Sequence, residues 1–308
     1  MRYRSWLLVP GDSERKLGKA LAASADVVVV DLEASVPLAS KGAAREAAAG
    51  WLSVHRKQVL EQAPMSRWVR INSLDSRQWR DDLIAVMPGA PEGIILPRAT
   101  GTEAMRLIAA ELYELEQAHR LTPGSTKIIP VVGETAGSTL TIPSYADAAM
   151  PRLAGLAWSP DSLAAAIGAT RQHDSKEGWG DPFRLVRAHT LLTAHASGIM
   201  SLEMVPGEPE DLKTAKAAAR NARADGFTGM LAVHPAQVAE INAAFTLSET
   251  EFEQARQSGG ALEDADLPLA ADRRQADGPQ FKLAKQMLGS GAEPRGVDLT
   301  PMRVLRST

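Results

Sequence analysis

Several charged and polar side chains follow directly on short apolar runs of this sequence. Glu134 comes after the run IIPVV and before a turn of small residues, and Arg70 ends the run RWVR. Asp31 and Glu33 follow the run VVVV. A carboxylate at the carboxyl end of a buried parallel strand adds nothing to a core and lies where α/β barrels place their chemistry. Polar side chains in comparable positions are also found at Asp161, Ser162 and His234.

Oxygen ligands dominate this set, which favours a hard cation such as Mg²⁺. Glu134 and Asp161 are the expected pair of ligands, because they follow neighbouring runs along the chain. Arg70 supplies a fixed positive charge and a planar fork, which suits a carboxylate or a developing enolate oxygen. A metal, an arginine and acids together indicate chemistry through an enolate: aldol or Claisen cleavage, or proton abstraction beside a carbonyl.

Each of these residues also has a structural interpretation. Glu134 can cap a helix over Thr139 to Asp147. Asp31 and Glu33 can cap a helix or form salt bridges, with Arg70 as their partner. His234 precedes a proline, which favours a role in orienting a loop over acid–base work.

The turn Pro10-Gly11 precedes a segment with helical spacing. Backbone N–H groups at the start of a helix can bind an anionic group, so the turn is a candidate for substrate binding. Asp12 or Ser13 can equally cap that helix.

The elements that must position these residues alternate along the chain. Apolar runs with strand character alternate with Ala-, Leu- and Arg-rich segments of helical spacing, such as Glu14 to Ala23, Ala43 to Leu60 and Glu103 to His119. Alternation of this kind predicts parallel βα units. Eight units predict an α/β fold with a closed (β/α)8 TIM barrel, for which about 250 residues is usual. The expected strands are Ser5 to Val9, Asp26 to Val30, Trp68 to Ile71, Gly93 to Leu96, Ile128 to Val132, Leu153 to Trp158, Met200 to Met204 and Met230 to Val233.

Composition limits the class of protein. The chain has 308 residues, 44% of them hydrophobic, which is enough for a barrel and an extension. A net charge of −3 without a Lys/Arg cluster predicts no nucleic-acid partner. There is no cysteine, so disulfides, zinc–thiolate sites and thiol catalysis are excluded. No apolar stretch resembles a signal or reaches the roughly 20 residues of a membrane span, so we expect a soluble, cytoplasmic protein without a membrane partner.

The sequence changes character after Phe245. It becomes polar and acidic and is interrupted by the breakers Ser258-Gly259-Gly260 and Gly289-Ser290-Gly291. We therefore predict a catalytic barrel domain over residues 1–247 and a C-terminal helical arm over residues 248–308. The arm would act as a lid or contact a neighbouring subunit.

Several segments resemble those of a known family. They are RSWLLVPGDSERKLGKALAASADVVVVDLEASV, RWVRIN, GIILPRAT, VVGETAG, LAWSPDSLAAAIGA and GFTGMLAVHPAQVAEIN, in this order from Arg4 to about Phe245. In these the chain resembles the citrate lyase beta-subunit-like proteins of the HpcH/HpaI aldolase superfamily. The resemblance implies a barrel of eight βα units, Mg²⁺, and lyase chemistry on malyl-, citramalyl- or citryl-thioesters of coenzyme A or an acyl carrier. It also implies a homo-oligomer, a trimer or a dimer of trimers.

The resemblance also implies roles for single residues. Glu134 matches the family's metal-binding glutamate, and Arg70 its substrate-binding arginine. The tail segment QADGPQFKLAKQML resembles a Met-Ile-Asp-x-Pro segment, which places Asp277 at an aspartate that reaches into the neighbouring subunit and handles the proton at the enolate carbon. From the residues alone, Asp277 is a turn residue before Gly278-Pro279.

Three positions depart from the family pattern. Ala34 replaces the second acid of Asp-Leu-Glu-Asp-Ser-Val, and Met230 stands where the family has lysine. Ser162 occupies the position of the second metal ligand, while the carboxylate of Asp161 falls one residue earlier. A shift by one residue turns a side chain to the other side of a strand. Asp161 therefore reaches the ion directly or through water, or the metal site is lost.

The expected function is that of a Mg²⁺-dependent carbon–carbon lyase acting on a short 3-hydroxyacyl thioester. Glu134 would hold the ion with Asp161 or Ser162, and Arg70, Glu33 and Asp277 are the expected catalytic residues. The acyl thioester and the 2-oxoacid would be bound by the residues Arg70, Glu134, Pro10, Gly11 and His234. The alternatives are a non-catalytic barrel that has lost its second ligand and an aldolase acting on a free hydroxy-oxo-acid.

Overall fold

The computed structural model describes residues 3–246, except residues 59–64, 148, 174–177 and 207. Tyr3–Phe245 forms one compact unit. The predicted arm over 248–308, with Asp277, lies outside the described residues, so its role stays a prediction.

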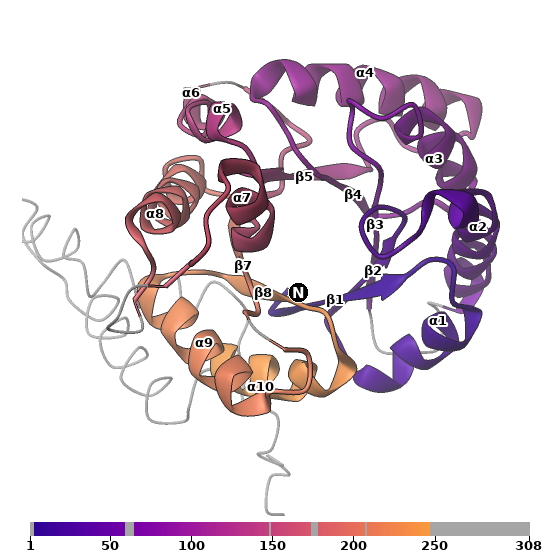
Figure 1. The fold of residues 1–308 in the computed structure, drawn as a ribbon. Coiled ribbons are helices and arrows are strands. Elements are labelled where there is room, and N and C mark those ends of the chain that lie inside the picture. Colours follow the sequence, from indigo (N-terminus) through magenta and orange to yellow (C-terminus); the bar gives the residue numbers. More distant parts are fainter. Residues whose placement is uncertain (1–2, 59–64, 148, 174–177, 207, 247–308) are drawn as a thin grey trace, which may run out of the picture. The chain divides into compact units, whose positions relative to one another are not determined.

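Eight parallel strands close into a barrel in sequence order, as the repeated βα pattern predicts (Figure 1). The fold is therefore a (β/α)8 TIM barrel. Each strand pairs with its successor, and β8 pairs with β1 to complete the ring. The strands are β1 (Ser5–Pro10), β2 (Val27–Asp31), β3 (Ser66–Arg70), β4 (Gly93–Leu96), β5 (Lys127–Val132), β6 (Gly155–Trp158), β7 (Met200–Met204) and β8 (Gly229–Ala232).

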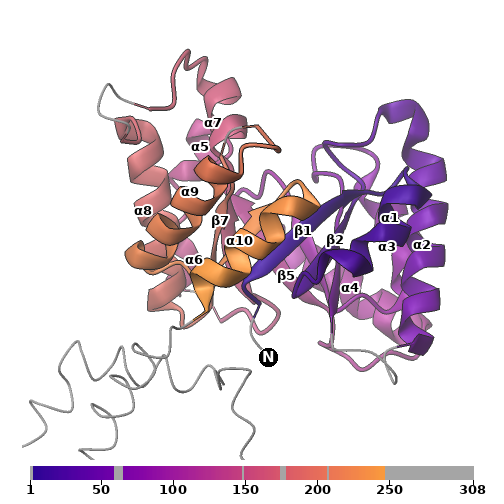
Figure 2. The same cartoon turned by 90° about the horizontal axis from the view of Figure 1, so that it is seen from below.

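Helices surround the barrel on its outside (Figure 1). In the side view of Figure 2, α7 lies at the upper end of the barrel. The α-helices are α1 (Glu14–Ala20), α2 (Lys41–Gln58), α3 (Trp79–Val86), α4 (Thr102–Ala118), α5 (Ala136–Thr139), α6 (Ser144–Asp147), α7 (Pro160–Ile167), α8 (Asp181–Ala196), α9 (Leu212–Asp225) and α10 (Pro235–Phe245). The short 3-10 helices are η1 (Leu21–Ala23), η2 (Leu38–Ser40) and η3 (Met87–Gly89).

The segment after β5 corrects one expectation. A single helix over Thr139 to Asp147 is wrong, since the segment contains the end of α5 and the whole of α6. Pro143 explains the interruption, because proline lacks an N–H group and disfavours helical geometry at the residue before it. The first helix is capped by Thr135, whose hydroxyl accepts from the Ser138 amide, and not by Glu134.

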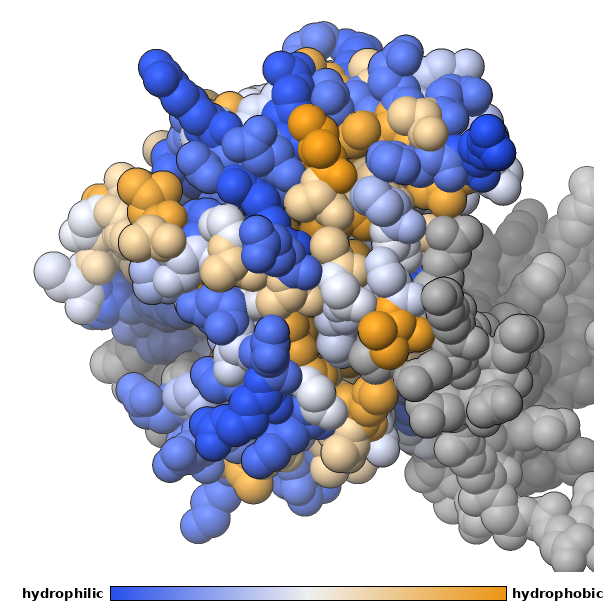
Figure 3. All heavy atoms as spheres, turned by 90° about the vertical axis from the view of Figure 1, so that its right-hand side faces the viewer, coloured by the Kyte–Doolittle hydropathy of each residue, from blue (hydrophilic) through white to orange (hydrophobic). Residues whose placement is uncertain are grey.

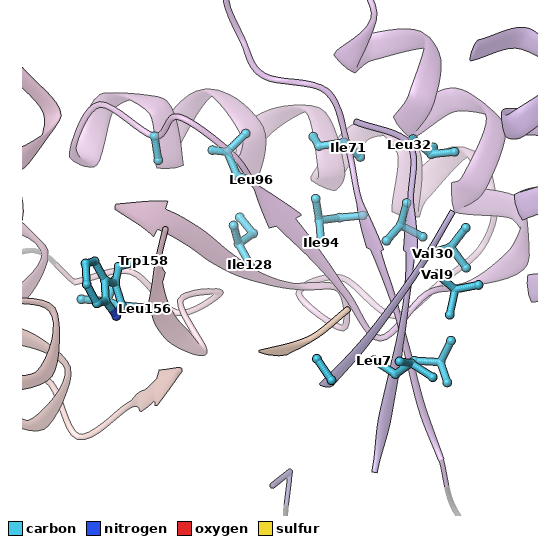
Figure 4. Close-up of a cluster of buried hydrophobic side chains, with 14 of the residues drawn as sticks. Leu7, Val9, Val30, Leu32, Ile71, Ile94, Leu96, Ile128, Leu156 and Trp158 are labelled. Atoms are coloured by element: carbon cyan, nitrogen blue, oxygen red, sulfur yellow. The ribbon is translucent and has the colours of Figure 1, made fainter. Parts of the chain in front are cut away.

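Strand side chains alternate between two apolar layers. The outer layer packs between the strands and the helices, as Figure 4 shows for Leu7, Val30 and Ile128. The inner layer fills the barrel and includes Trp6 and Trp68, whose ring centroids are 5.0 Å apart in an edge-to-face arrangement. The barrel is thus a packed core and not a pore.

The inner layer becomes polar at the carboxyl ends of the strands. Asp31 continues the inward series of Val27 and Val29 on β2, and Arg70 continues Trp68 on β3. The ladder register pairs Asp31 with Arg70 on the neighbouring strand. The alternation that buries the core therefore also brings these two charges together.

The outside of the barrel is largely polar on the face seen in Figure 3, where hydrophobic side chains are interspersed among hydrophilic ones. In the part of the chain that the structure describes, no helix combines the length and the apolar character that a bilayer crossing requires.

Candidate active site

Arg70 and Asp31 form a two-pronged ion pair at the carboxyl ends of β3 and β2. Arg70 Nε donates to Asp31 Oδ1 and Nη2 to Oδ2, both at 2.7 Å. The third nitrogen, Nη1, lies 3.6 Å from an oxygen of Glu33. This is the arrangement that the structural interpretation of these residues predicts, in which Arg70 is the salt-bridge partner of Asp31 and Glu33. The pairing fixes the guanidinium and leaves both Nη1 hydrogens and one Nη2 hydrogen unused by Asp31.

Asp31 is buried and accepts several further hydrogen bonds. Its oxygens accept from the backbone N–H groups of Glu33 and Ser35, both at 2.9 Å, and from the Ser35 hydroxyl. Burial by itself raises the pKa of Asp31, but the Arg70 charge and these hydrogen bonds outweigh it and lower the pKa to about 2. Asp31 is therefore an anion over the whole physiological range.

A buried lysine holds the turn that follows β2. Lys41 Nζ, at the start of α2, donates to the carbonyl oxygens of Leu32 at 2.6 Å and Glu33 at 2.7 Å. The side-chain amide of Asn72 donates to the same Leu32 carbonyl at 2.9 Å. Both donors anchor the backbone that carries Asp31 and Glu33, so the loop after β2 is tied to helix α2 and to the segment after β3.

This anchor continues into a second buried carboxylate. Asp82 on α3 is fully buried and accepts from the Asn72 backbone at 2.8 Å and from its side chain at 2.7 Å. Arg45 on α2 donates to the other oxygen at 2.7 Å. Because a buried charge is stable only when it is paired and hydrogen-bonded, this network must form as a unit.

Glu134 reaches the barrel mouth because Gly133 interrupts the alternation of β5. Ile129 and Val131 face inward, so strict alternation would turn residue 134 outward. Gly133 instead has φ +71°, and a Cβ there would point at Val186 on α8 in the outer layer. The left-handed glycine thus reverses the direction of the next side chain, and the backbone N–H of Arg98 after β4 donates to the Glu134 carboxylate.

Ser162, and not Asp161, lies beside Glu134. The Ser162 hydroxyl is close enough to the Glu134 carboxyl to lower its pKa, and it lies 3.0 Å from the Ser159 hydroxyl. Asp161 is exposed and accepts from Gln172 Nε2 at 2.6 Å. The structure brings Ser162 to Glu134 because residue 162 lies on the first turn of α7, one residue further round the helix than Asp161.

Burial raises the pKa of Glu134, while the Arg98 N–H and the Ser162 hydroxyl lower it. Glu33 raises the pKa further through its negative charge, and Arg70 lowers it. The carboxyl is therefore a desolvated group with two neutral hydrogen-bond donors, near charges of both signs.

The other expected site residues lie around the same end. The Gly11 N–H donates to the Asp31 carbonyl at 2.8 Å, which places the Pro10-Gly11 turn beside β2, while Ser13 caps α1. His234 Nδ1 accepts weakly from the Ala236 N–H at 3.3 Å, and Gln237 accepts from the His234 N–H, so His234 forms part of a loop turn. The sequence singles out two other positions. Of these, Ala34 is exposed, and Met230 packs in the outer layer.

The donor set suits a hard cation in part. Mg²⁺ commonly takes one or two protein carboxylates and completes its shell with water and substrate. Glu134 supplies a buried carboxylate that forms no ion pair with any described arginine or lysine, and Ser162 adds a neutral oxygen. Among the described residues, no group of three His, Asp or Glu side chains is arranged to hold a metal. Glu134 and Ser162 therefore fit a site that leaves most of the coordination shell to water and substrate.

Four residues at this end escaped the sequence interpretation. Lys41, Asn72 and Asp82 form the buried anchor, and Arg98 touches Glu134 through its backbone. Asn72 and Arg98 carry a usable signal, because each follows a strand by one or two residues. Lys41 and Asp82 carry none, because polar residues of amphipathic helices are normally exposed.

Comparisons with known proteins agree with the barrel fold. A model of the HpcH/HpaI aldolase/citrate lyase family matches residues 4–235. An L-malyl-CoA/beta-methylmalyl-CoA lyase of Cereibacter sphaeroides is 30% identical over 85% of each chain. A (3S)-malyl-CoA thioesterase of the same organism is 29% identical over 86% of this chain and 84% of the relative. The crystal structure of CitE from Mycobacterium tuberculosis with magnesium, acetoacetate and coenzyme A has a TM-score of 0.71 and 28% identity, and covers 95% of this chain and 99% of that chain.

Proposed function

We propose that this chain, which belongs to the HpcH/HpaI aldolase/citrate lyase family, is a Mg²⁺-dependent carbon–carbon lyase. Its substrate would be a short 3-hydroxyacyl thioester such as malyl-CoA, citramalyl-CoA or citryl-CoA. Cleavage would give an acyl thioester and a 2-oxoacid, and condensation would reverse this. The lyase named among the relatives acts on malyl-CoA thioesters, and the CitE complex contains both magnesium and coenzyme A.

One observation carries the proposal: the desolvated carboxyl of Glu134 lies at the same barrel mouth as the fixed guanidinium of Arg70. A buried acid of this kind is a candidate ligand for a cation, and the arginine is a candidate for stabilising a developing oxyanion. Neither Glu134 nor Arg70 belongs to the apolar inner layer of the barrel, so packing of that layer does not explain their presence.

Glu134 and Ser162 are the residues proposed to hold the ion. A bound Mg²⁺ would supply Lewis-acid chemistry at the oxygens of the 2-oxoacid part of the substrate. Glu134 must be ionised for this role, so binding of the cation should strengthen as pH rises through its raised pKa.

Arg70 is proposed to stabilise the enolate. In cleavage the 3-hydroxyl proton passes to water, the bond between carbons 2 and 3 breaks, its electron pair passes to the thioester enolate, and carbon 3 becomes the carbonyl carbon of the 2-oxoacid. Asp31 engages Nε and Nη2 of Arg70, so Nη1 is the nitrogen available to the enolate oxygen. Glu33, 3.6 Å from Nη1, would keep that nitrogen directed into the mouth.

Asp277 is proposed to deliver the proton that the enolate carbon needs to complete cleavage, and to remove it in condensation. The residue would come from a neighbouring subunit of a trimer or hexamer, on the resemblance of its segment alone. Pro10, Gly11 and His234 are proposed to line the path of the acyl thioester around the strand ends.

Turnover of a panel of malyl-CoA, citramalyl-CoA and citryl-CoA tests this function. With Mg²⁺ present, 2-oxoacid should be released, and Glu134→Gln should lower kcat by about 100-fold or more, as loss of a metal ligand does. Ser162→Ala should raise the Mg²⁺ requirement, whereas Asp161→Asn is the matched control and should behave like wild type. If Asp161→Asn raised the Mg²⁺ requirement as much as Ser162→Ala, Asp161 would be the second ligand instead of Ser162.

Thioester hydrolysis is the second candidate, favoured by the (3S)-malyl-CoA thioesterase among the relatives. It breaks the carbon–sulfur bond and releases free coenzyme A with a hydroxy diacid, whereas the lyase releases a 2-oxoacid and keeps the thioester. Measuring free thiol and 2-oxoacid in the same reaction separates the two.

Two other outcomes would favour the remaining alternatives. Release of 2-oxoacid from free hydroxy-oxo-acids alone would favour the aldolase. No turnover, together with unchanged Mg²⁺ binding in Glu134→Gln, would favour a non-catalytic barrel.

A further inference from the structure

Arg98 has an unusual backbone for its position. Among the described non-glycine residues with positive φ, Ser24, Ala90 and Arg120 lie at or just after the ends of helices, where such geometry is common. Arg98, with φ +51°, instead follows the end of strand β4. Left-handed geometry is costly for a residue with a side chain and is found preferentially at functional sites.

This geometry gives Arg98 two separate contacts. Its backbone N–H donates to the Glu134 carboxylate, so the residue borders the proposed cation site. Its side chain extends to the loop after β3, where Nη2 lies 3.2 Å from Asp75 Oδ2. The guanidinium is therefore carried by the same rim of the barrel mouth, although it does not itself touch Glu134.

The ion pair between Arg98 and Asp75 is exposed, so Arg98 can leave Asp75 for another anionic partner. The side chains of Arg98 and Asp75 are 51% and 58% exposed, so water screens their attraction. The Ser73 hydroxyl also donates to Asp75 and would keep that carboxylate in place without Arg98. By contrast, the pair between Arg70 and Asp31 is buried and doubly hydrogen-bonded.

Arg98 is held less firmly than Arg70 and Lys41, the cations described near Asp31. Asp31 engages Arg70 through two nitrogens, and Lys41 donates to the carbonyl oxygens of Leu32 and Glu33. A substrate of the proposed class carries a carboxylate at one end and phosphates at the other. A guanidinium binds either group through two parallel hydrogen bonds.

We propose that Arg98 is a movable anion-binding residue at the barrel mouth, which leaves Asp75 to bind a negatively charged group of the substrate. The carboxylate of the 2-oxoacid and the phosphates of coenzyme A are the two possible sources of that charge. Asp75 competes with the substrate for the guanidinium and so weakens binding in the wild type. The substrate class rests on the proposed function, but the binding step does not require turnover.

Calorimetric titration with two probes tests this on the full chain: pyruvate in the presence of Mg²⁺, and coenzyme A alone. Arg98→Gln should weaken binding of one probe by about tenfold or more, since a charge-assisted hydrogen bond is lost. Asp75→Asn should strengthen binding of the same probe, because the competing carboxylate is gone. The double variant should behave like Arg98→Gln, and the affected probe identifies the group.

Arg106→Gln on α4 is the matched control, since it removes another arginine that is more than half exposed and is paired with Glu103, and it should leave both affinities unchanged. Arg98→Lys should restore part of the affinity, which separates loss of charge from misfolding. The proposal is overturned if Arg98→Gln binds both probes like wild type, if wild type binds neither probe, or if Asp75→Asn weakens binding as much as Arg98→Gln. Absence of turnover in wild type, together with the expected changes in binding, would instead count against the proposed lyase and leave the binding role of Arg98 in place.

Discussion

At the scale of single residues, the barrel mouth joins charges that differ in how firmly they are held. Asp31 is 1% exposed and ionised with a pKa of about 2, whereas burial raises the pKa of Glu134. The difference follows from their partners, because Asp31 faces a guanidinium and Glu134 faces neutral donors. One carboxylate is thus committed to structure, and the other is available to a cation.

Asp31 should make the stability of the protein depend on acid pH. Its folded pKa lies below the unfolded value of about 3.9, so its contribution is fully present above pH 4 and is lost as pH falls through about 2. The lowered pKa corresponds to about 2–3 kcal/mol. We expect the wild type to have a higher free energy of unfolding than Asp31→Asn at pH 7, and this difference should become smaller as pH falls to 2. Urea unfolding of both proteins across this pH range measures it.

Asp181→Asn is the control for this experiment, because Asp181 is exposed and its ion pair with Arg184 is worth little. Its unfolding free energy should follow that of wild type at every pH. If the difference in unfolding free energy between wild type and Asp31→Asn stayed constant down to pH 2, Asp31 would act through packing and not through its charge.

At the scale of elements, the turns after the strands aim the functional side chains. The turn from β5 to α5 reverses the direction of Glu134 through Gly133, and the turn after β2 is held by Lys41 and Asn72. In the part of the chain that the structure describes, neither Lys41 nor Asn72 forms a hydrogen bond with Glu134; their partners are backbone carbonyls and Asp82. Backbone geometry therefore positions the acid as much as its own hydrogen bonds do.

Replacing Gly133 by alanine should damage both stability and activity. A Cβ would lie 2.3 Å from Val186 Cγ1, and the positive φ is strained for any side chain. We expect a loss of about 2–4 kcal/mol in unfolding free energy from strain and overpacking, and a lower kcat from a misdirected Glu134. Urea denaturation and steady-state turnover measure the two effects.

Gly137→Ala, four residues further on, is the matched control. A Cβ at Gly137 meets nothing within 4 Å and the residue lies inside α5, so stability should be unchanged or rise by up to about 1 kcal/mol. Adding Val186→Ala to Gly133→Ala should recover the steric part of the loss. If Gly133→Ala and Gly137→Ala were equally stable, the turn would be able to adopt another geometry.

At the scale of the whole molecule, the site depends on closure of the barrel. Eight strands must meet in a ring before their carboxyl ends share one mouth, and the last contact joins β8 to β1. There Gly229 packs against backbone atoms at the start of the chain, and Met230 donates to the Arg4 carbonyl at 2.8 Å. Closure thus relies on close backbone approach between segments 225 residues apart in sequence.

Gly229→Ala should weaken that closure. Its Cβ would lie 2.5 Å from the Tyr3 carbonyl oxygen and 2.9 Å from that of Arg4, and backbone atoms cannot rotate away. We expect a loss of about 2–3 kcal/mol in unfolding free energy, with secondary structure and tryptophan fluorescence lost in one transition. Gly50→Ala on α2, where a Cβ meets nothing within 4 Å, should be neutral or stabilising. Two separate transitions in Gly229→Ala would indicate that the strands near the seam unfold on their own.

The sequence by itself determined the barrel and the end of it at which the polar strand-end residues gather. Continuous apolar runs alternating with helical segments predict parallel βα units, and this arrangement depends on local patterns that each segment carries. The polar residues at the strand ends followed from the same patterns, so Arg70 and Glu134 were predicted at the mouth where the structure places them.

Only the tertiary structure decided how those residues are arranged. It placed Ser162 instead of Asp161 against Glu134, paired Arg70 with Asp31, and revealed Lys41, Asn72 and Asp82 behind the loop. Sequence order does not fix these contacts, because a one-residue rotation on a first helical turn or one left-handed glycine redirects a side chain without changing the hydrophobic pattern. The fold is encoded by repetition along the chain, whereas the site is encoded by single torsion angles where the strands end.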